Sequence, residues 1–423
     1  MKTTQSFHSV SKFSIIKIFI LLILTFLITT SCDLTDPKKD KPKPEGYQED
    51  IPWPSLEGVP WAIHHGNPQF TGRSKEVGPQ LGIVEWQIKL PNKGYRFSSI
   101  LSPVIGKDGT IIFVSYDDID PPGSFLYAVS SDGDIKWRFP LSTDKNTAPP
   151  IISSSGNIYV ADWESDFFCL DTDGNLKWNI KLNRPSWGIM NIDKEGNIYG
   201  MAADGVLYSF TPDGSIRWQL KISDFGTSSD AIAFSPDGNT LYLKNKRSGI
   251  YGISTAGEIK WKFSEIDFSK DYTSPLVTSQ GMIFTLSGSL PIKSDGTRDT
   301  LLEQKISYGI GKNYLLDITP TIDKYGNLYI ASEKFIISYD YFGNVRWRID
   351  NLSLQYGFGL LCDISGNIYY MQIDHTLVCM NDAGIKIWEL KLDGESYYSP
   401  AIHNGRIYIG TINGASKYFY SIK

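Results

Sequence analysis

The chain has 423 residues, of which 41% are hydrophobic and 21% charged, as is typical of a packed globular protein. Its 38 glycines and 13% aromatic residues favour many short strands joined by tight turns. The formal net charge is −5, and because the first 31 residues hold three lysines and no acid, the remainder carries −8. A phosphate backbone requires a basic stripe and the sequence shows none, so we expect no nucleic-acid partner.

The N-terminus predicts export. Residues 14–28 form an apolar run behind a lysine-bearing start, so we interpret residues 1–31 as a secretory signal peptide. The small residues before Cys32 resemble the lipobox of bacterial lipoproteins, although Thr29 stands where that box prefers leucine. The resemblance implies a lipidated Cys32; an ordinary cleavage site and a retained anchor are the alternatives. We interpret residues 32–50, rich in proline and charge, as the lipidated cysteine and a disordered tether.

After a lead-in over residues 51–82, a Gly-x-x-x-Trp motif recurs through the chain. Its copies end at Trp137, Trp178, Trp218, Trp261, Trp347 and Trp388, at spacings of 41, 40, 43, 86 and 41 residues. The interval of 86 is two steps of 43, and the missing copy falls at residues 295–306, where a leucine replaces the tryptophan. The period of about 40 residues predicts a repeat architecture.

Each period contains four short β segments. In one copy these are residues 148–153, 157–162, 166–171 and 175–182, with glycine-containing turns joining the first pair and the last pair. Proline recurs at the first segment, where a missing N–H costs least, as Pro103, Pro149, Pro275, Pro320 and Pro400. Four strands per period of about 40 residues are the signature of propeller blades, so the fold class is all-β.

Counting the blades predicts how the ring closes. Seven blades end near residues 141, 182, 222, 265, 306, 350 and 392, and residues 399–423 supply three strands of an eighth. Residues 83–90 match the fourth-strand pattern, although they precede the first blade. We therefore predict an eight-bladed β-propeller of four-stranded antiparallel blades over residues 83–423, closed by strand 83–90 and monomeric. Closure would leave no free sheet edge.

The repeats resemble the pyrroloquinoline-quinone-like propeller family, over residues 53–423, although here Asp rather than Thr precedes the turn glycine. The resemblance implies a structural docking role for one tryptophan in each blade, namely Trp86, Trp137, Trp178, Trp218, Trp261, Trp347 and Trp388. A quinone dehydrogenase of this family would show an adjacent cysteine pair, a calcium-ligand set and an aspartate base. None of these is recognisable, so we expect no cofactor and no enzymatic activity.

The candidate metal sites are weak. The stretch Asp171-Thr-Asp173-Gly-Asn175 opens like a calcium loop, but Leu182 stands where a bidentate glutamate is needed, so turn formation is the better interpretation. His64 and His65 are neighbours in an extended lead-in, and their rings should point to opposite sides. We expect no metal site.

The remaining cysteines predict no special chemistry. Three cysteines remain, Cys169, Cys362 and Cys379, and no two of them are close in sequence. This odd number and wide spacing predict neither a disulfide framework nor a CxxC metal site. Cys169 and Cys379 occupy the same place in two repeats, where small buried residues fit. No Gly-x-Ser-x-Gly elbow marks a hydrolase.

The longer connections should project from one face of the propeller and form the candidate binding face. They carry Tyr95, Arg96, Arg184, Trp187, Tyr272, Tyr308, Tyr314, Tyr356, Tyr397 and Tyr398, with an acidic insertion at residues 117–120. Exposed aromatics with arginine suit contact with a protein or a glycan, although they could equally pack on neighbouring loops. The leading hypothesis is a non-catalytic binding or scaffolding lipoprotein, similar in plan to the propeller lipoproteins of outer-membrane protein assembly and anchored to the outer membrane. A quinone-dependent enzyme and a surface glycan-binding module are the alternatives.

Overall fold

The structure is a computed structural model that describes residues 42–92, 100–117, 122–141, 148–162, 166–182, 188–224, 226–227, 230–269, 271–285, 288–311, 318–414 and 416–423. Residues 1–44 and 45–423 form separate compact units, and every element below belongs to the second unit. The predicted signal peptide and Cys32 lie outside the described residues.

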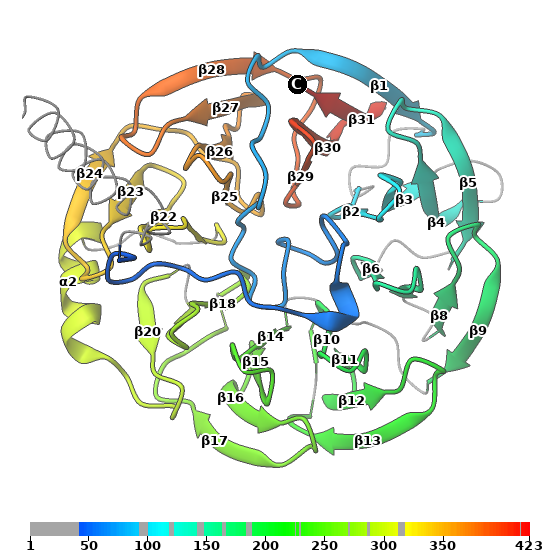
Figure 1. Ribbon diagram of the computed structural model, residues 1–423, viewed down its shortest axis with the longest axis horizontal. Helices are drawn as coiled ribbons and strands as arrows, with labels where there is room; N and C mark the ends of the chain where they lie inside the picture. The colour runs from blue at the N-terminus through cyan, green and yellow to red at the C-terminus, as the bar shows by residue number, and fades with distance from the viewer. Residues whose placement is uncertain are drawn as a thin grey trace, which may run out of the picture. The chain divides into compact units, whose positions relative to one another are not determined.

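Eight antiparallel sheets are arranged in a ring, which confirms the predicted propeller (Figure 1). Blades 1 to 4 are β2–β5 (Val104–Ile105, Ile111–Asp117, Gly123–Val129, Ile135–Pro140), β6–β9 (Ile151–Ile152, Ile158–Ala161, Asp166–Leu170, Leu176–Lys181), β10–β13 (Asn191–Ile192, Ile198–Met201, Val206–Phe210, Ile216–Lys221) and β14–β17 (Ala231–Phe234, Thr240–Asn245, Gly249–Ser254, Ile259–Phe263). Blades 5 to 7 are β18–β20 (Leu276–Val277, Ile283–Thr285, Leu290–Ile292), β21–β24 (Thr321–Ile322, Leu328–Ala331, Ile336–Tyr339, Val345–Ile349) and β25–β28 (Leu361–Cys362, Ile368–Met371, Thr376–Met380, Lys386–Lys391). Blade 8 joins β29–β31 (Ala401–His403, Arg406–Asn413, Ser416–Ile422) to β1 (Val84–Leu90).

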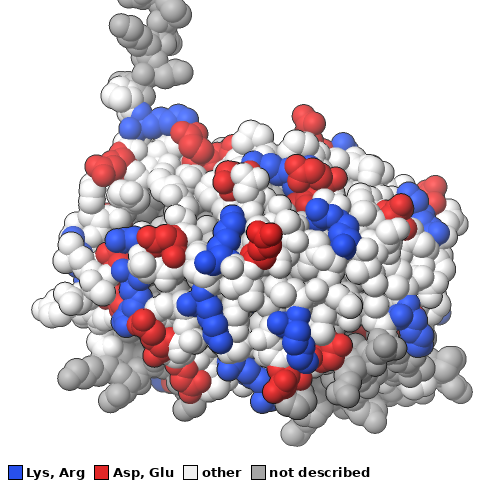
Figure 2. All heavy atoms as spheres, turned by 90° about the horizontal axis from the view of Figure 1, so that it is seen from below, with Lys and Arg blue, Asp and Glu red and all other residues white. Residues whose placement is uncertain are grey.

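Burial explains the sequence pattern of each blade. The first three strands lie between neighbouring blades and read as nearly continuous apolar runs, as in the fully buried β7. The fourth strand forms the outer side of the blade, and its exposure alternates from residue to residue, as in β9. On the side of the propeller seen in Figure 2, basic and acidic side chains are interspersed without a broad patch of one sign.

The ring closes between the two ends of the propeller sequence. Strand β1 pairs antiparallel with β31, in a register that places Trp86 opposite Ser421 and Lys89 opposite Tyr418. Backbone hydrogen bonds of 3.1 and 3.0 Å join Ile83 and Lys423 in both directions. The predicted closure by an N-terminal strand is therefore confirmed.

Blade 5 departs from the prediction of four strands. Its residues 295–306 form a turn and then part of helix α2 (Thr300–Ile310) in place of a fourth strand. The Asp299 side chain caps the helix by accepting a hydrogen bond of 3.0 Å from the Leu302 backbone N–H. The helix packs against the edge of β20 and buries its own Ile306 and Ile310. Covering an unpaired edge strand with a helix protects it from pairing with another chain. Among the described residues, no helix has the length and apolar character needed to cross a membrane.

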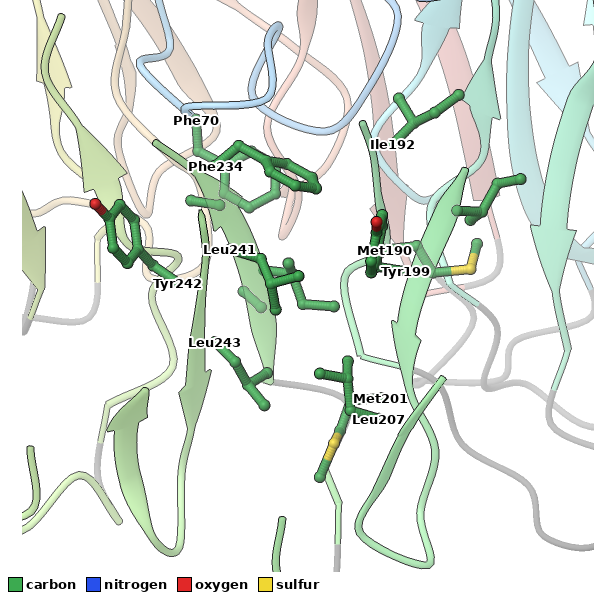
Figure 3. Close-up of a cluster of buried hydrophobic side chains, with 14 of the residues drawn as sticks. Phe70, Met190, Ile192, Tyr199, Met201, Leu207, Phe234, Leu241, Tyr242 and Leu243 are labelled. Carbon is green, nitrogen blue, oxygen red and sulfur yellow. The ribbon is translucent and has the colours of Figure 1, made fainter. Parts of the chain in front are cut away.

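The lead-in crosses the centre of the ring (Figure 1). Its carbonyl oxygens accept hydrogen bonds of 2.7 to 3.3 Å from the first strands of six blades, pairing Trp61 with Ile105, Ala62 with Ile152, Pro68 with Phe234, Gln69 with Val277, Thr71 with Ile322 and Gly72 with Cys362. Its Phe70 side chain belongs to the large apolar cluster that contains Phe234 and Tyr199 (Figure 3). The segment therefore joins blades that are distant in sequence.

The lead-in begins earlier than expected. Residues 45–50 were predicted to belong to the tether, yet Gln48 is buried and its Nε2 donates a hydrogen bond of 2.8 Å to the Gln280 side chain. Arg73 fixes the position of this segment, because its guanidinium donates a hydrogen bond to the Gln48 carbonyl and forms an ion pair of 2.8 Å with Asp50. These contacts hold the segment on the propeller.

Candidate binding site

Seven tryptophans make the same contact between neighbouring blades. Each tryptophan stands on an outer strand, and its Nε1 donates a hydrogen bond of 2.7 to 3.1 Å to a backbone carbonyl beside the next blade's outer strand. The pairs are Trp86–Ser131, Trp137–Thr172, Trp178–Pro212, Trp218–Thr255, Trp261–Ser294, Trp347–Asp382 and Trp388–Pro79. The ring lies over a turn glycine, so that a Cβ on Gly214 would come 3.0 Å from Trp178. Six of the rings are half-buried, and only Trp388 is buried.

The junction between blades 5 and 6 has no such tryptophan. Here Leu302 of α2 lies over the turn glycine, and a Cβ on Gly343 would come 2.6 Å from the Leu302 Cδ1 atom. Lys305 Nζ donates a hydrogen bond of 2.9 Å to the Phe342 carbonyl of the same turn. The leucine predicted to replace tryptophan thus reaches the docking position from a helix.

Beside Leu302 lies a groove of about 550 Å³, which we call the α2 groove. Its buried apolar lining comes from both blades and the helix, and consists of Phe284, Ile306, Ile322, Leu328 and Tyr339. Leu301 and Phe342 line it as well and remain 67% and 50% exposed. A concave apolar site with exposed apolar residues at its edge is the usual form of a binding site. This groove was not predicted from the sequence, because the segment that forms helix α2 was predicted to be a strand.

Half of the residues of the predicted binding face fall within the described part of the chain. Tyr95, Arg96, Arg184, Trp187 and Tyr314 lie outside the described residues, as do Asp118, Ile119 and Asp120. Tyr272 lies under Lys246 Nζ at 3.2 Å from the ring centroid, and Tyr356 and Tyr397 form a ring pair at 5.4 Å. Tyr398 packs on the apolar cluster of blades 1 and 2, while Tyr308, on α2, is 91% exposed.

Two buried ion pairs were not predicted. Lys417 of blade 8 lies 3.4 Å from Asp117 of blade 1, and Lys244 of blade 4 lies 3.5 Å from Asp271. Asp117 was expected in an exposed acidic insertion, but it is the last residue of β3 and is buried. Removing one partner of a buried pair leaves an uncompensated charge, so the loss of either residue would destabilise the contact between the two blades.

The two adjacent histidines lie at the centre of the ring. Their ring centroids are 5.6 Å apart, so the prediction of opposite orientations was wrong. The cause is the left-handed backbone of His65, whose φ of 58° interrupts the alternation of an extended chain. Burial lowers the pKa of His64 to about 3 and that of His65 to about 4, which keeps both rings neutral. His64 Nδ1 forms a hydrogen bond of 2.9 Å with the Ser102 hydroxyl.

The calcium-like loop is a turn. The Asp171 carboxylate accepts hydrogen bonds of 3.0 Å from the Asn175 side-chain amide and of 2.9 and 3.0 Å from the backbone N–H groups of Asn175 and Asp173, and these bonds lower its pKa. Within the described part of the chain, no three His, Cys, Asp or Glu side chains gather as a metal site would require. The turn interpretation of this stretch is confirmed.

Cys169, Cys362 and Cys379 are buried free thiols. Cys169 pairs across the sheet with Trp178, and Cys379 with Trp388, so the two occupy the same place in their blades, as predicted. Burial raises the pKa of Cys169 and of Cys379 to about 12 and raises that of Cys362 as well. These thiols are therefore poor nucleophiles.

A thiol reagent should detect this burial. In a Cys32→Ser variant of the protein, we expect Ellman's reagent at pH 8 to label no thiol while the chain is folded, and all three in urea. Rapid labelling of a cysteine in the folded protein would contradict the packing described here.

Comparisons with known proteins identify the repeat. Residues 122–308 match the family model described as outer membrane protein assembly factor BamB. No curated protein sequence matches the chain. The crystal structure of BamB from Moraxella catarrhalis is similar, with 14% identity, a TM-score of 0.58 and coverage of 80% of this chain and 100% of that one.

Two quinohemoprotein alcohol dehydrogenases are also similar in structure. The enzyme from Comamonas testosteroni has 12% identity and a TM-score of 0.63, and covers 87% of this chain and 81% of its own. The enzyme ADHIIG from Pseudomonas putida HK5 has 11% identity and a TM-score of 0.62, with coverage of 87% and 80%. At these identities the likeness shows the shared fold. Residues 122–308, from blade 1 into helix α2, are similar to the propeller repeat of the family model described as outer membrane protein assembly factor BamB, in agreement with the resemblance that the tryptophan motif indicated.

Proposed function

We propose that this protein is a non-catalytic scaffold of the bacterial cell envelope that binds a protein partner through the surface of its propeller. The observation that carries the proposal is the α2 groove, an apolar site with exposed Leu301 and Phe342, in a chain whose repeat matches that of an assembly factor. Apolar and aromatic anchors in such sites supply most of the energy of protein binding. The partner would be an envelope protein, and we propose a monomeric scaffold that binds no nucleic acid.

The centre of the propeller supports a non-catalytic role. The lead-in crosses this centre, and its Trp61, His64, His65 and Phe70 are buried. A quinone bound at the centre would have to share the space with these side chains. Both histidines have lowered pKa values and are neutral at pH 7. A quinone-dependent enzyme is the alternative that shares this fold, and a saturable absorbance change on titration with quinone and calcium would favour it.

The proposal is tested by affinity capture from membranes. The tagged full-length protein should retain one envelope protein in stoichiometric amount after detergent extraction and chemical crosslinking. Capture of a glycan instead would favour the surface glycan-binding module, to which the exposed Tyr308 and Tyr356 are chemically suited. Recovery of neither would contradict the scaffold proposal.

We further propose that the scaffold is anchored through a lipid on Cys32, with the outer membrane as its location. The apolar run of residues 14–28 and the small residues before Cys32 support this, as the signal peptide and the lipidation site respectively.

The Cys32→Ser variant should consequently move from the detergent-extracted membrane fraction to the soluble fraction of the envelope. Its melting temperature should equal that of the wild type, because the propeller begins beyond this residue. Unchanged membrane retention of the folded variant would exclude lipid anchoring at Cys32.

A further inference from the structure

The α2 groove occupies the one junction that lacks a docking tryptophan. At the other seven junctions an indole ring lies over a turn glycine, and its N–H donates a hydrogen bond to a backbone carbonyl two or three residues before that glycine. At the junction of blades 5 and 6 the glycine is Gly343, and the residue that corresponds to Asp382 in the turn of blade 7 is Tyr341. Among the described residues, no backbone N–H donates a hydrogen bond to the Tyr341 carbonyl. The junction thus keeps the docking turn without the indole.

The replacement by Leu302 leaves space. Leucine is smaller than tryptophan, and the helix approaches the turn from the edge of blade 5, so a groove of about 550 Å³ remains next to Gly343 and Tyr341. Its lining is apolar and buried, and Leu301 and Phe342 extend this apolar surface outward to solvent. The other junctions show which side chain fits between such a turn and the neighbouring blade.

The charges around the groove define the rest of the ligand. Three carboxylates line it, from Asp295, Asp299 and Asp340, against the ammonium groups of Lys293 and Lys305. Both kinds of group are already engaged: Lys305 donates to the Phe342 carbonyl, while Asp295 accepts from Thr297, Asp299 from Leu302 and Asp340 from Asn344. With three carboxylates and two ammonium groups the lining keeps a net negative charge, which favours a positively charged segment.

The chain's own docking segments have this chemistry. In five outer strands a basic residue directly precedes the tryptophan, as Lys136, Lys177, Arg217, Lys260 and Arg346. Arg346 forms an ion pair of 3.2 Å with Asp382, in the same turn that accepts the Trp347 indole N–H. Arg346 shows that such a turn can contact a basic residue next to the docked tryptophan. The other four basic residues donate hydrogen bonds within their own blades, Lys136 to Thr110, Lys177 to Asn157, Arg217 to Ser209 and Lys260 to Thr240.

We propose that the α2 groove binds a segment of a partner protein that presents a tryptophan next to a lysine or arginine. The indole lies beside Leu302 above the Gly343 turn, and its N–H reaches the Tyr341 carbonyl, while the basic side chain faces the carboxylates of the groove. This inference rests on the proposed scaffold function, because it names the chemistry of the partner.

The binding test uses a peptide with the sequence GNLKWNIKL, taken from residues 174–182 and labelled with fluorescein. Fluorescence anisotropy with the detergent-solubilised full-length protein should show saturable binding. Replacing the tryptophan of the peptide by alanine should weaken binding by at least about tenfold, as expected for the loss of an aromatic anchor. Absence of saturable binding, or equal binding of both peptides, would overturn the proposal.

Variants of the protein locate the site. Leu302→Trp supplies the missing indole within the chain, so peptide binding should fall by at least about tenfold while the melting temperature rises. Phe342→Ala removes an exposed part of the lining and should weaken binding about fivefold without loss of fold. Tyr308→Ala is the matched control, because this residue is on the same helix, is 91% exposed and does not line the groove. Binding that is equal in wild type and Phe342→Ala would place the peptide elsewhere and overturn the proposal.

Two further outcomes separate this inference from the function on which it rests. If wild type and Phe342→Ala capture the same membrane partner equally, the scaffold proposal stands and the groove is not its docking site. If the peptide binds as expected but no partner is captured, the groove proposal stands and the scaffold proposal fails. A wild type that sediments as a dimer, with a monomeric Leu302→Trp variant, would assign the groove to a second copy and overturn the partner proposal.

Discussion

Deletion of residues 46–90 should cause the protein to aggregate. The deletion removes β1, which pairs with β31, and exposes the backbone N–H and C=O groups of that strand as an unpaired edge. It also removes the lead-in carbonyls that accept hydrogen bonds from six other blades. Size-exclusion chromatography and thermal unfolding measure the effect.

The control is a deletion of residues 33–44, which lie before the propeller unit. This variant should stay monomeric with the melting temperature of the wild type. A single substitution, Trp86→Ala, should act through the same closure, because Trp86 Nε1 donates a hydrogen bond of 2.8 Å to Ser131 of blade 1 and its ring covers Gly133. Since the ring is half-buried, we expect a loss of about 3 kcal/mol, at the lower end for buried tryptophan. A monomeric 46–90 deletion with unchanged melting temperature would show that the ring does not depend on this closure.

The repeat could be predicted from the sequence because its determinants are local. Each turn glycine with its following tryptophan marks the last two strands of a blade. The structure shows that each such tryptophan lies over the turn glycine of the next copy of the motif, as Trp178 lies over Gly214. The closure followed from counting strands. These features depend on residues that are close in sequence or that recur at a fixed period.

Helix α2 was missed because the period was extended over a segment that had lost its pattern. The sequence held a local signal, since Asp299 precedes a run of leucine, glutamate, glutamine and lysine without alternation, and these residues favour a capped helix. The α2 groove was missed with it. The repeat pattern is lost in this segment, and local helix propensity decides its structure.

The lead-in could not be predicted from the sequence for a different reason. Its path across the centre is fixed by hydrogen bonds from Ala62, Pro68 and Gly72 to strands that are distant in sequence. No periodicity in the sequence predicts such bonds. The left-handed conformation of His65 follows from that path. Non-local contacts also explain why Asp117, expected on the surface, is buried beside Lys417.

The central histidines should make the propeller sensitive to mild acid. In the folded chain burial lowers the pKa of His64 to about 3 and that of His65 to about 4, below the ordinary value of 6.5. An unfolded chain therefore binds more protons than the folded one below pH 6.5. Their contribution to stability is complete above that pH and is lost as the pH falls toward 4 and 3. Between pH 7 and pH 5 each histidine should cost about 2 kcal/mol of unfolding free energy.

Urea unfolding at pH 7 and pH 5 measures this loss, and a substitution separates the histidines from other titrating groups. His64→Gln keeps a side chain able to hydrogen bond with Ser102 but has no titratable ring, so the loss between the two pH values should shrink by about 2 kcal/mol. If His64→Gln and the wild type lost equal stability from pH 7 to pH 5, His64 would not be held neutral by burial at the centre of the ring.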